Sequence, residues 1–218
     1  MLKCFMLIAF FLQAIFAAAQ VPVSKEPRHH NVFENDFVRV LDVHIAPKDT
    51  TLFHKHETPS VFIVLTPVKT GSEVIMEEMH ATALSKDAAI SFEGFYKKPR
   101  VHRVWNEDTA EFHVMDIELL NKNPRNIGSP VQQKDLKLLF DEKPVRGYRL
   151  TLGEASTMQL PAHTPFLIVG LTDALPAVSV NKKSLSKKGD FLFIKAGDSI
   201  KFINDGQQSY SFAVLELK

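Results

Sequence analysis

The sequence repeats itself, and this repetition limits the fold more than any other feature. Several residues of the first half recur 107 positions later, and in both halves the repeated histidine is soon followed by a Thr-Pro pair and an apolar run. The matched residues are Phe33 and Phe140, Val38 and Val145, Arg39 and Arg146, and His56 and His163. Towards the end of each copy the shift falls to 98, because the first copy carries a longer loop. Two tandem copies of one unit explain this pattern.

Each copy is predicted to be a series of short strands. Apolar runs are separated by turn residues at intervals of roughly ten, which is typical of antiparallel sandwiches and barrels. The predicted strands are 37–45, 61–65, 73–79, 88–92, 100–106 and 112–120. The 17 phenylalanines also favour strands, and no long amphipathic helix is indicated. Residues 121–136 are polar, with two prolines and a glycine, and are predicted to be a linker. We therefore expect an all-β fold of two tandem antiparallel β-barrels, over 28–120 and 137–218.

The N-terminus has the three parts of a secretory signal peptide. Lys3 is the charged head, residues 4–16 form an apolar core, and Ala17 begins a run of small residues. We predict a signal peptide over 1–19, cleaved before Gln20, and an exported protein, periplasmic or secreted. An uncleaved membrane anchor is the alternative, but the apolar run is short for a span. Cleavage removes the only cysteine, so any metal must be bound by His, Asp or Glu.

The charge of the chain is nearly balanced. The 26 Lys and Arg residues against 25 Asp and Glu residues give a net charge of +1. This balance argues against a surface built to bind nucleic acid. The sequence also has no Gly-rich phosphate loop and no convincing Ser-His-Asp arrangement. The expected partner is therefore a small molecule.

The segment 52–65, LFHKHETPSVFIVL, holds the strongest candidate site. Because alternate side chains of a strand share a face, His54 and His56 are expected to point together into a barrel, while Lys55 points away. Two imidazoles are an incomplete metal site, since a protein-bound transition metal normally takes at least three protein ligands. His102, in the segment PRVHRVWN, is the best-placed third histidine of the first unit.

The H-x-H segment and the H-x-x-x-N segment that begins at His102 together resemble the two motifs of the cupin family. The resemblance covers 37–119 well and 140–218 in weakened form. Cupins are small antiparallel β-barrels of jelly-roll type, and tandem copies are called bicupins. The resemblance implies that the three histidines converge on one metal ion. Cupins often pair through their sheets, so the resemblance leaves both a homodimer and a monomer open.

The first unit departs from the family pattern after its second histidine. Cupins usually place a glutamate there, but this chain has Ser60, whose neutral hydroxyl is a poor ligand and could instead hold a water. Glu57 is the nearest carboxylate, yet it follows His56 directly and would have to reach around the turn. Phe62 and Val64 share the inward parity and would make the cavity floor apolar. We therefore expect an all-histidine site, with Ser60, Glu57 and Phe62 as candidate pocket residues.

The expected chemistry follows from this set of ligands. Three neutral imidazoles leave a divalent ion with its full charge and with open coordination positions. Nitrogen ligands alone do not discriminate iron, zinc, manganese, nickel or copper. Some cupins, including thiol dioxygenases and diketone-cleaving enzymes, use three-histidine iron sites, so the resemblance implies a non-haem iron dioxygenase that acts on a small molecule. The alternatives are a non-catalytic small-ligand-binding or structural cupin module, and a metal-dependent isomerase or lyase.

The second copy is predicted to have lost the metal site. It keeps His163 but has Ile200 where the third histidine would be, and one histidine cannot hold a metal. We expect this degenerate unit to serve as a structural or interface partner. Arg39 and Asn106 recur in the second copy, so they are assigned to the scaffold and to a turn, respectively.

The remaining histidines are given ordinary roles. His29 and His30 are predicted to be a flexible N-terminal pair. His44, His80 and His113 are predicted to be strand or loop residues, with His44 close enough in sequence to line the mouth of the pocket. Candidates for the rim of the pocket are Glu93, Tyr96 and Arg100.

Overall fold

The protein is an all-β molecule, as the sequence predicts. A computed structural model describes residues 20–75, 80–82, 89–95, 98–173, 177–197 and 199–218. Within these ranges the only helical element is the 3-10 turn η1 (Val23–Lys25), and no helix there is long and apolar enough to cross a membrane. The predicted signal peptide lies outside the described residues, so both it and the export that depends on it stay predictions.

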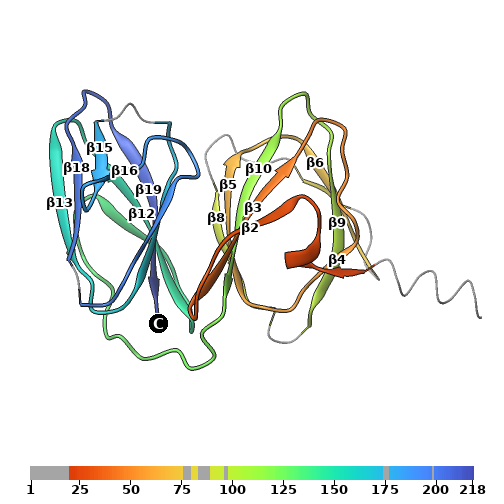
Figure 1. Ribbon diagram of the computed structural model, residues 1–218, viewed down its shortest axis with the longest axis horizontal. Helices are drawn as coiled ribbons and strands as arrows, with labels where there is room; N and C mark the ends of the chain where they lie inside the picture. Colours follow the sequence, from red (N-terminus) through yellow and green to blue (C-terminus); the bar gives the residue numbers. More distant parts are fainter. Residues whose placement is uncertain (1–19, 76–79, 83–88, 96–97, 174–176, 198) are drawn as a thin grey trace, which may run out of the picture.

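The first ten strands form two sheets, which together are called the N-terminal unit (Figure 1). One sheet has the order β1-β4-β9-β6-β7 and the other has the order β2-β3-β10-β5-β8. The strands are β1 (Val21–Pro22), β2 (His29–Glu34), β3 (Val38–Ile45), β4 (His54–His56), β5 (Ser60–Thr66), β6 (Thr70–Val74), β7 (His80–Thr82), β8 (Ile90–Glu93), β9 (Arg100–Asn106) and β10 (Phe112–Leu119). The predicted strand 73–79 is placed too late, because β6 begins at Thr70; residues 76–79 and 88 lie outside the described part.

The last nine strands form the C-terminal unit in the same manner. Its sheets have the orders β11-β12-β19-β14-β17 and β13-β18-β15-β16. The strands are β11 (Leu136–Asp141), β12 (Val145–Leu152), β13 (Ser156–Pro161), β14 (Phe166–Gly170), β15 (Val178–Val180), β16 (Lys183–Ser184), β17 (Phe191–Ile194), β18 (Ser199–Asn204) and β19 (Tyr210–Leu217). In the described residues all ladders are antiparallel except β1 with β4, and no ladder joins two sheets into a closed cylinder. Each predicted barrel is thus a pair of separate sheets.

The two units repeat one strand order and one irregularity. The strands β2, β3, β10, β5 and β8 occupy the positions that β11, β12, β19, β14 and β17 hold in the second unit. A register shift precedes Phe33 in the ladder of β2 with β3, and the same shift precedes Phe140 in the ladder of β11 with β12. This repetition matches the sequence repeat, while the exact domain boundaries stay a prediction.

The repeated arginine and asparagine belong to the scaffold in both units, as predicted. Arg39 donates a hydrogen bond to Glu118 at 2.6 Å, and Arg146 donates one to Glu216 at 3.1 Å. The amide nitrogen of Asn106 donates to the carbonyls of Ile45 and Ala110. The corresponding carbonyls that accept from Asn204 belong to Leu152 and Gln208. These bonds fix the turn that precedes the last strand of each unit.

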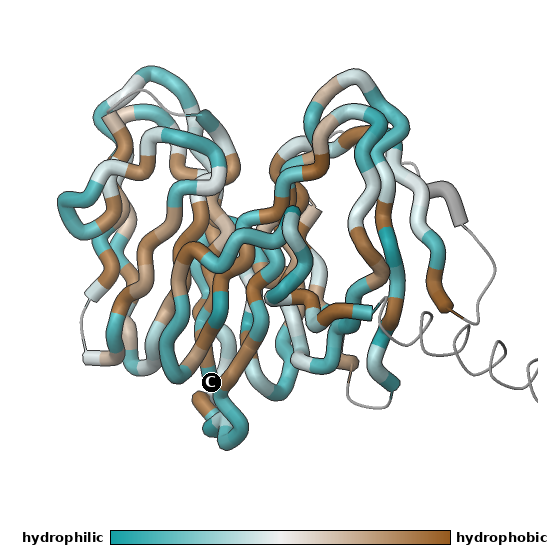
Figure 2. The backbone as a smooth tube through the Cα atoms, turned by 45° about the vertical axis from the view of Figure 1, so that its right-hand side comes forward, coloured by the Kyte–Doolittle hydropathy of each residue, from teal (hydrophilic) through white to brown (hydrophobic). Residues whose placement is uncertain are grey.

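Three apolar cores account for the packing. One lies inside each unit, and the third lies between them, where the sheet that contains β3 and β10 faces the sheet that contains β12 and β19 (Figures 1 and 2). This inter-unit core includes Ile63 and Ile117 from the N-terminal unit and Leu167 and Leu215 from the C-terminal unit, all 0% exposed. Phenylalanine rings extend it: the Phe33 centroid lies 5.8 Å from that of Phe191. The second unit therefore packs directly against the outer face of the first.

We predict that Gly147→Ala destabilises the fold. A Cβ at Gly147 would lie 2.2 Å from Cζ of Phe140, so the ring would have to leave its packing position. Overpacking of this kind costs about 1–3 kcal/mol. Urea unfolding measures the loss, and Gly153→Ala is the matched control, because the nearest atom to a Cβ there is 3.8 Å away. An equal effect of both substitutions would contradict this explanation.

Candidate metal centre

Two strands bring the three predicted ligands together. In β4 the side chains of His54 and His56 are buried on one face, while Lys55 between them is half-buried on the other. The strand β9 pairs antiparallel with β4 so that His102 lies directly opposite His54. Residues opposite each other in a ladder have neighbouring side chains. The period of two in β4 and this register therefore place the three imidazoles side by side.

The imidazoles are close enough to share one ion. Each offers a ring nitrogen, and these three atoms lie within 4.8 Å of one another. The ring centroid of His54 lies 4.6 Å from that of His102 and 5.0 Å from that of His56. Nε2 of His56 and Nε2 of His102 are 3.1 Å apart. Ligand atoms bound to one ion at about 2.0–2.1 Å are separated by comparable distances.

Burial keeps the imidazoles neutral. It lowers the pKa of His54 to about 4 and that of His102 to about 3, and neighbouring histidines add to both shifts. Burial followed by the proximity of His102 and His54 likewise lowers the pKa of His56. A metal binds the neutral form of imidazole. At neutral pH the three rings therefore offer lone pairs instead of positive charges.

A backbone carbonyl orients one of the rings, and a carboxyl group faces a second. Nδ1 of His54 donates a hydrogen bond to the backbone carbonyl of Leu52 at 2.9 Å, which leaves Nε2 as the free lone pair. Nδ1 of His56 faces the carboxylate of Asp116 at 3.5 Å and has no other partner. Metal-binding histidines commonly direct the second ring nitrogen to a carbonyl or a carboxylate. These buried donors and acceptors fit a metal ion held by the three Nε2 atoms.

Asp116 is a site residue that the sequence analysis missed. It is 1% exposed, and both of its carboxylate oxygens are buried without a hydrogen bond. Burial, with a smaller effect from nearby Glu118, raises its pKa to about 8, and the nearby Ser60 hydroxyl only partly opposes this shift. The available signal was a pair of acidic residues, Asp116 and Glu118, on one face of the otherwise apolar strand FHVMDIEL.

The histidines border a cavity of about 490 Å³ inside the N-terminal unit. Phe62 lines it as predicted, and so do Glu93 and Arg100 from the predicted rim. Tyr96 lies outside the described residues. Apolar side chains, among them Val64 and Val104, form much of the wall. A cavity of this size accommodates a small molecule beside the histidines.

The other two candidate pocket residues lie elsewhere. Ser60 is fully buried, and its hydroxyl donates to the carbonyl of Thr58 at 3.2 Å instead of lining the cavity. Glu57 is exposed and forms an ion pair with Lys55 at 2.6 Å. Glu57 follows the last residue of β4 and has the same parity as Lys55, so its side chain lies on the outer face with the lysine. No carboxylate therefore completes the histidine cluster from this turn.

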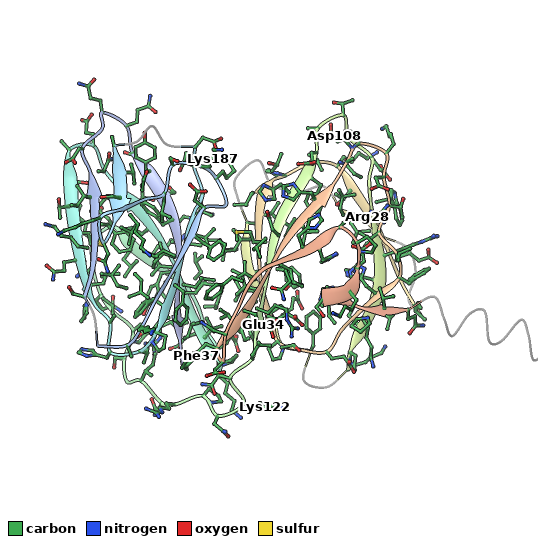
Figure 3. All side chains as sticks on the ribbon, in the orientation of Figure 1. Arg28, Glu34, Phe37, Asp108, Lys122 and Lys187 are labelled. Atoms are coloured by element: carbon green, nitrogen blue, oxygen red, sulfur yellow. The ribbon has the colours of Figure 1, made fainter. Side chains whose placement is uncertain are left out.

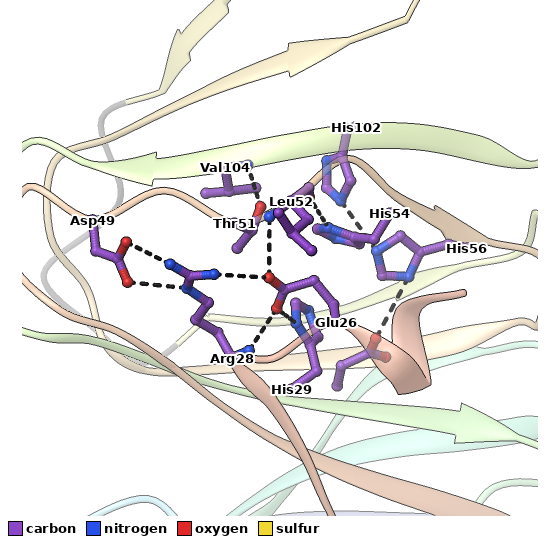
Figure 4. A network of polar contacts seen from close by, with 11 residues as sticks. Glu26, Arg28, His29, Asp49, Thr51, Leu52, His54, His56, His102 and Val104 are labelled. Carbon is purple, nitrogen blue, oxygen red and sulfur yellow. Dashed lines mark hydrogen bonds and ion pairs between the residues drawn. The ribbon is translucent and has the colours of Figure 1, made fainter. Parts of the chain in front are cut away.

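His29 corrects another prediction, because it is ordered and buried instead of flexible. It begins β2, and its ring centroid lies 4.7 Å from that of His54 (Figure 4). Its Nδ1 contacts the carboxylate of Glu26 at 2.6 Å. Burial alone would raise the pKa of Glu26, but hydrogen bonds from His29 and from the backbone amides of Leu52 and Arg28 outweigh it and lower the pKa. The histidine cluster is thus joined to a buried anion from the N-terminal segment.

The corresponding place in the C-terminal unit is apolar, as predicted. There Leu160 lies opposite Ile200 in the ladder of β13 with β18, and both are buried. His163 is exposed. Among the described residues, no group of three potential ligands occurs in this unit. In the described residues the histidine cluster therefore belongs to the N-terminal unit.

Comparison with known proteins shows the fold. No family model and no curated protein matches the sequence. A cupin 2 conserved barrel domain protein from Leptotrichia buccalis is 11% identical over 89% of this chain and 91% of its own, with a TM-score of 0.54. The bacterial pirin of Escherichia coli, solved in complex with nickel(II), is 15% identical over 87% of this chain and 90% of its own, with a TM-score of 0.58. A salicylate 1,2-dioxygenase from Pseudaminobacter salicylatoxidans is 8% identical over 85% of this chain and 72% of its own, with a TM-score of 0.55. The chain thus has the fold of cupin-domain proteins.

Proposed function

We propose that the protein is an exported bicupin whose N-terminal unit binds one divalent transition metal and acts on a small molecule as a metal-dependent oxygenase. The observation that carries the proposal is the convergence of three neutral imidazoles, two of them buried and that of His102 half-buried, on the wall of a cavity of about 490 Å³. The C-terminal unit, with an apolar interior at the corresponding place, is the degenerate copy. Solved structures with the same fold include a nickel(II) complex and a dioxygenase, which supports the proposal by analogy.

Each group of cavity residues has a separate proposed role. A bound divalent ion would supply Lewis acidity and open coordination positions beside the substrate. His54, His56 and His102 hold the ion, and Phe62 contacts the apolar part of the substrate. Arg100 lies opposite His56 in the ladder and lines the same cavity, so its positive charge favours a substrate that carries an anionic group. The substrate class that fits is a small apolar molecule with one anionic group.

Metal binding by the cavity site is the first test. After reconstitution with Fe²⁺, Ni²⁺ or Zn²⁺, wild-type protein should retain at least one equivalent that both His54→Ala and His102→Ala lose. Each variant removes one of three ligands, and three is the usual minimum for a transition metal. Elemental analysis after gel filtration measures the content, with circular dichroism to show that the variants are folded. His163→Ala removes an exposed histidine and should change nothing. Equal metal content in all four proteins would reject the site.

Oxygen consumption separates catalysis from binding. The iron-loaded protein should take up O₂ with at least one member of a panel of small thiols, diketones and hydroxy acids, and His102→Ala should abolish the uptake. Metal that is retained without any O₂ uptake would favour the non-catalytic ligand-binding module.

N-terminal sequencing of the exported protein tests the proposed signal peptide. The mature sequence should begin at Gln20.

A metal-dependent isomerase or lyase is the second candidate, and Asp116 favours it. With a pKa of about 8 the buried carboxyl of Asp116 holds a proton at neutral pH, beside the cavity and next to His56. Such a group can deliver or accept a proton during a rearrangement. Incorporation of solvent deuterium into a panel substrate in the absence of O₂ would distinguish this activity from an oxygenase.

A further inference from the structure

A second cluster of potential ligands lies on the opposite face of the same strands. The strands β3 and β10 direct Leu41, Val43 and Val114 into the N-terminal unit and direct the alternate residues towards the C-terminal unit. At one end of this outer face, His44 lies directly opposite His113 in the ladder. This placement corrects the expectation that His44 lines the mouth of the metal cavity, because His44 faces away from that cavity.

The cluster is compact. The imidazoles of His44 and His113 stack with centroids 4.2 Å apart and planes inclined by 21°. Asp42 lies between them, with one carboxylate oxygen 2.6 Å from Nε2 of His113 and the other 3.1 Å from Nε2 of His44. The candidate ligand atoms of these three residues all lie within 4.8 Å of one another. Such separations are those of ligands in one coordination shell.

A fourth residue determines which nitrogen of His44 is free. Nδ1 of His44 contacts the carboxylate of Glu111 at 2.8 Å, and a carboxylate only accepts, so this nitrogen is the donor. A neutral imidazole has one donor nitrogen, so Nε2 then presents a lone pair to the carboxylate of Asp42. Two acceptors that face each other need a cation between them, either a proton or a metal. The Glu111–His44 pair has the carboxylate–histidine arrangement that orients metal ligands.

The cluster opens onto a cleft between the two units. The cleft encloses about 470 Å³ and is lined by Asp42 and His113 on one side and by the loop 187–190 on the other. Lys187 of this loop lies beside the gap between the units (Figure 3). Gly189 has a φ of 89°, and a Cβ there would lie 3.2 Å from Cε1 of His113. Loop 187–190 therefore approaches the imidazole of His113 closely, and a side chain at Gly189 would crowd it.

We propose that Asp42, His44 and His113 form a second binding site for a divalent transition metal of the zinc class, separate from the cavity site. Two imidazoles and one carboxylate are a common set of three protein ligands for zinc, and they leave at least one position open. Glu111 is a positioning residue that holds His44 through Nδ1. The ion would cross-link β3 and β10 at the cleft.

Zn²⁺ binding to the full-length mature chain tests the proposal, with isothermal titration as the measurement. Asp42→Asn keeps the shape of the side chain and removes its charge, and His113→Ala removes one imidazole. Loss of a residue that only hydrogen-bonds to a metal ligand lowers metal affinity by about 10–100-fold. Loss of a ligand itself should therefore lower the affinity for one Zn²⁺ equivalent by at least about 100-fold. Glu111→Gln should weaken the same equivalent by about 10-fold or more.

Matched variants separate this site from the cavity site. His102→Ala should leave the equivalent that depends on Asp42 unchanged, and the exposed His163→Ala should alter neither equivalent. If the cavity site binds no metal, the equivalent that depends on Asp42 remains, so the two proposals fail independently. Zn²⁺ binding that is unchanged in folded Asp42→Asn and His113→Ala would overturn the second site.

Discussion

Asp116→Asn should stabilise the metal-free protein relative to wild type, by an amount that grows as the pH rises from about 4 to about 8. Asp116 is fully buried, and burial followed by the nearby Glu118 raises its pKa from 3.8 to about 8 in the folded state. The unfolded chain loses this proton near pH 3.8. Between the two values the folded state holds one more proton than the unfolded state, so wild-type stability falls as the pH rises. Asparagine does not ionise and escapes this loss.

The difference in free energy of unfolding between Asp116→Asn and wild type should grow by about 1.4 kcal/mol for each pH unit. This is the free energy that corresponds to one pKa unit. Urea unfolding of wild type and Asp116→Asn at several pH values, with a chelator present, measures it as the difference between the two proteins. The exposed Asp36→Asn is the matched control and should differ from wild type by a constant amount. If the stability difference between Asp116→Asn and wild type does not change with pH, then Asp116 has the same pKa in the folded protein as in the unfolded chain.

The buried histidines act in the opposite direction in the same experiment. The pKa of His54 is lowered from 6.5 to about 4 and that of His102 to about 3. Below pH 6.5 the unfolded chain therefore takes up protons that the folded state refuses, and stability is lost as the pH falls. Two histidines outweigh one aspartate in this range. From the combined effect of His54, His102 and Asp116, the metal-free protein should be most stable near pH 6.5.

Leu215→Ala should destabilise both units together, by about 2–5 kcal/mol. Leu215 is 0% exposed and lies in the inter-unit core, which combines residues of β3, β5 and β10 with residues of β12, β14 and β19. Truncation removes contacts that both sheets use. Because each unit covers one face of the other, loss of the interface exposes apolar surface on both sides.

The only tryptophan of the chain makes this prediction specific. Trp105 lies in β9 of the N-terminal unit, far along the chain from Leu215, so its fluorescence reports unfolding of the N-terminal unit. The fluorescence transition in urea should shift by the same amount as the transition followed by circular dichroism. Leu138→Ala removes an exposed side chain of the C-terminal unit and should change stability by less than about 0.5 kcal/mol. A fluorescence transition that stays in place in Leu215→Ala would mean that the units unfold independently.

The parts of the candidate site that were predictable depend on local patterns. Alternation along a strand placed His54 and His56 on one face and Phe62 in the cavity wall, and the resemblance to the H-x-x-x-N motif of cupins indicated His102. Glu57 was a candidate only because it is the carboxylate nearest to His56 in the sequence. It shares the parity of Lys55, and Lys55 is its ion-pair partner.

The parts that were missed depend on contacts between distant segments. His29 was assigned to a flexible end because nothing local indicates Glu26 as its partner or His54 as its neighbour. The sequence shows that Asp116 is an acidic residue in an apolar strand. Its position next to His56 follows only from the packing of the two sheets against each other. Sequence periodicity records the face that a residue occupies and not the residue that it meets.

The sequence by itself indicated the all-β class and placed His54 and His56 on one face of a strand, because both follow from short-range periodicity. The tertiary structure decided the rest. It set the register that places His102 opposite His54, the burial that keeps the imidazoles neutral, and the inter-unit core. It also placed His44 beside His113 at the cleft. These features arise from pairings between strands far apart in the chain, and such pairings are selected by the packing of whole sheets, which no local pattern contains.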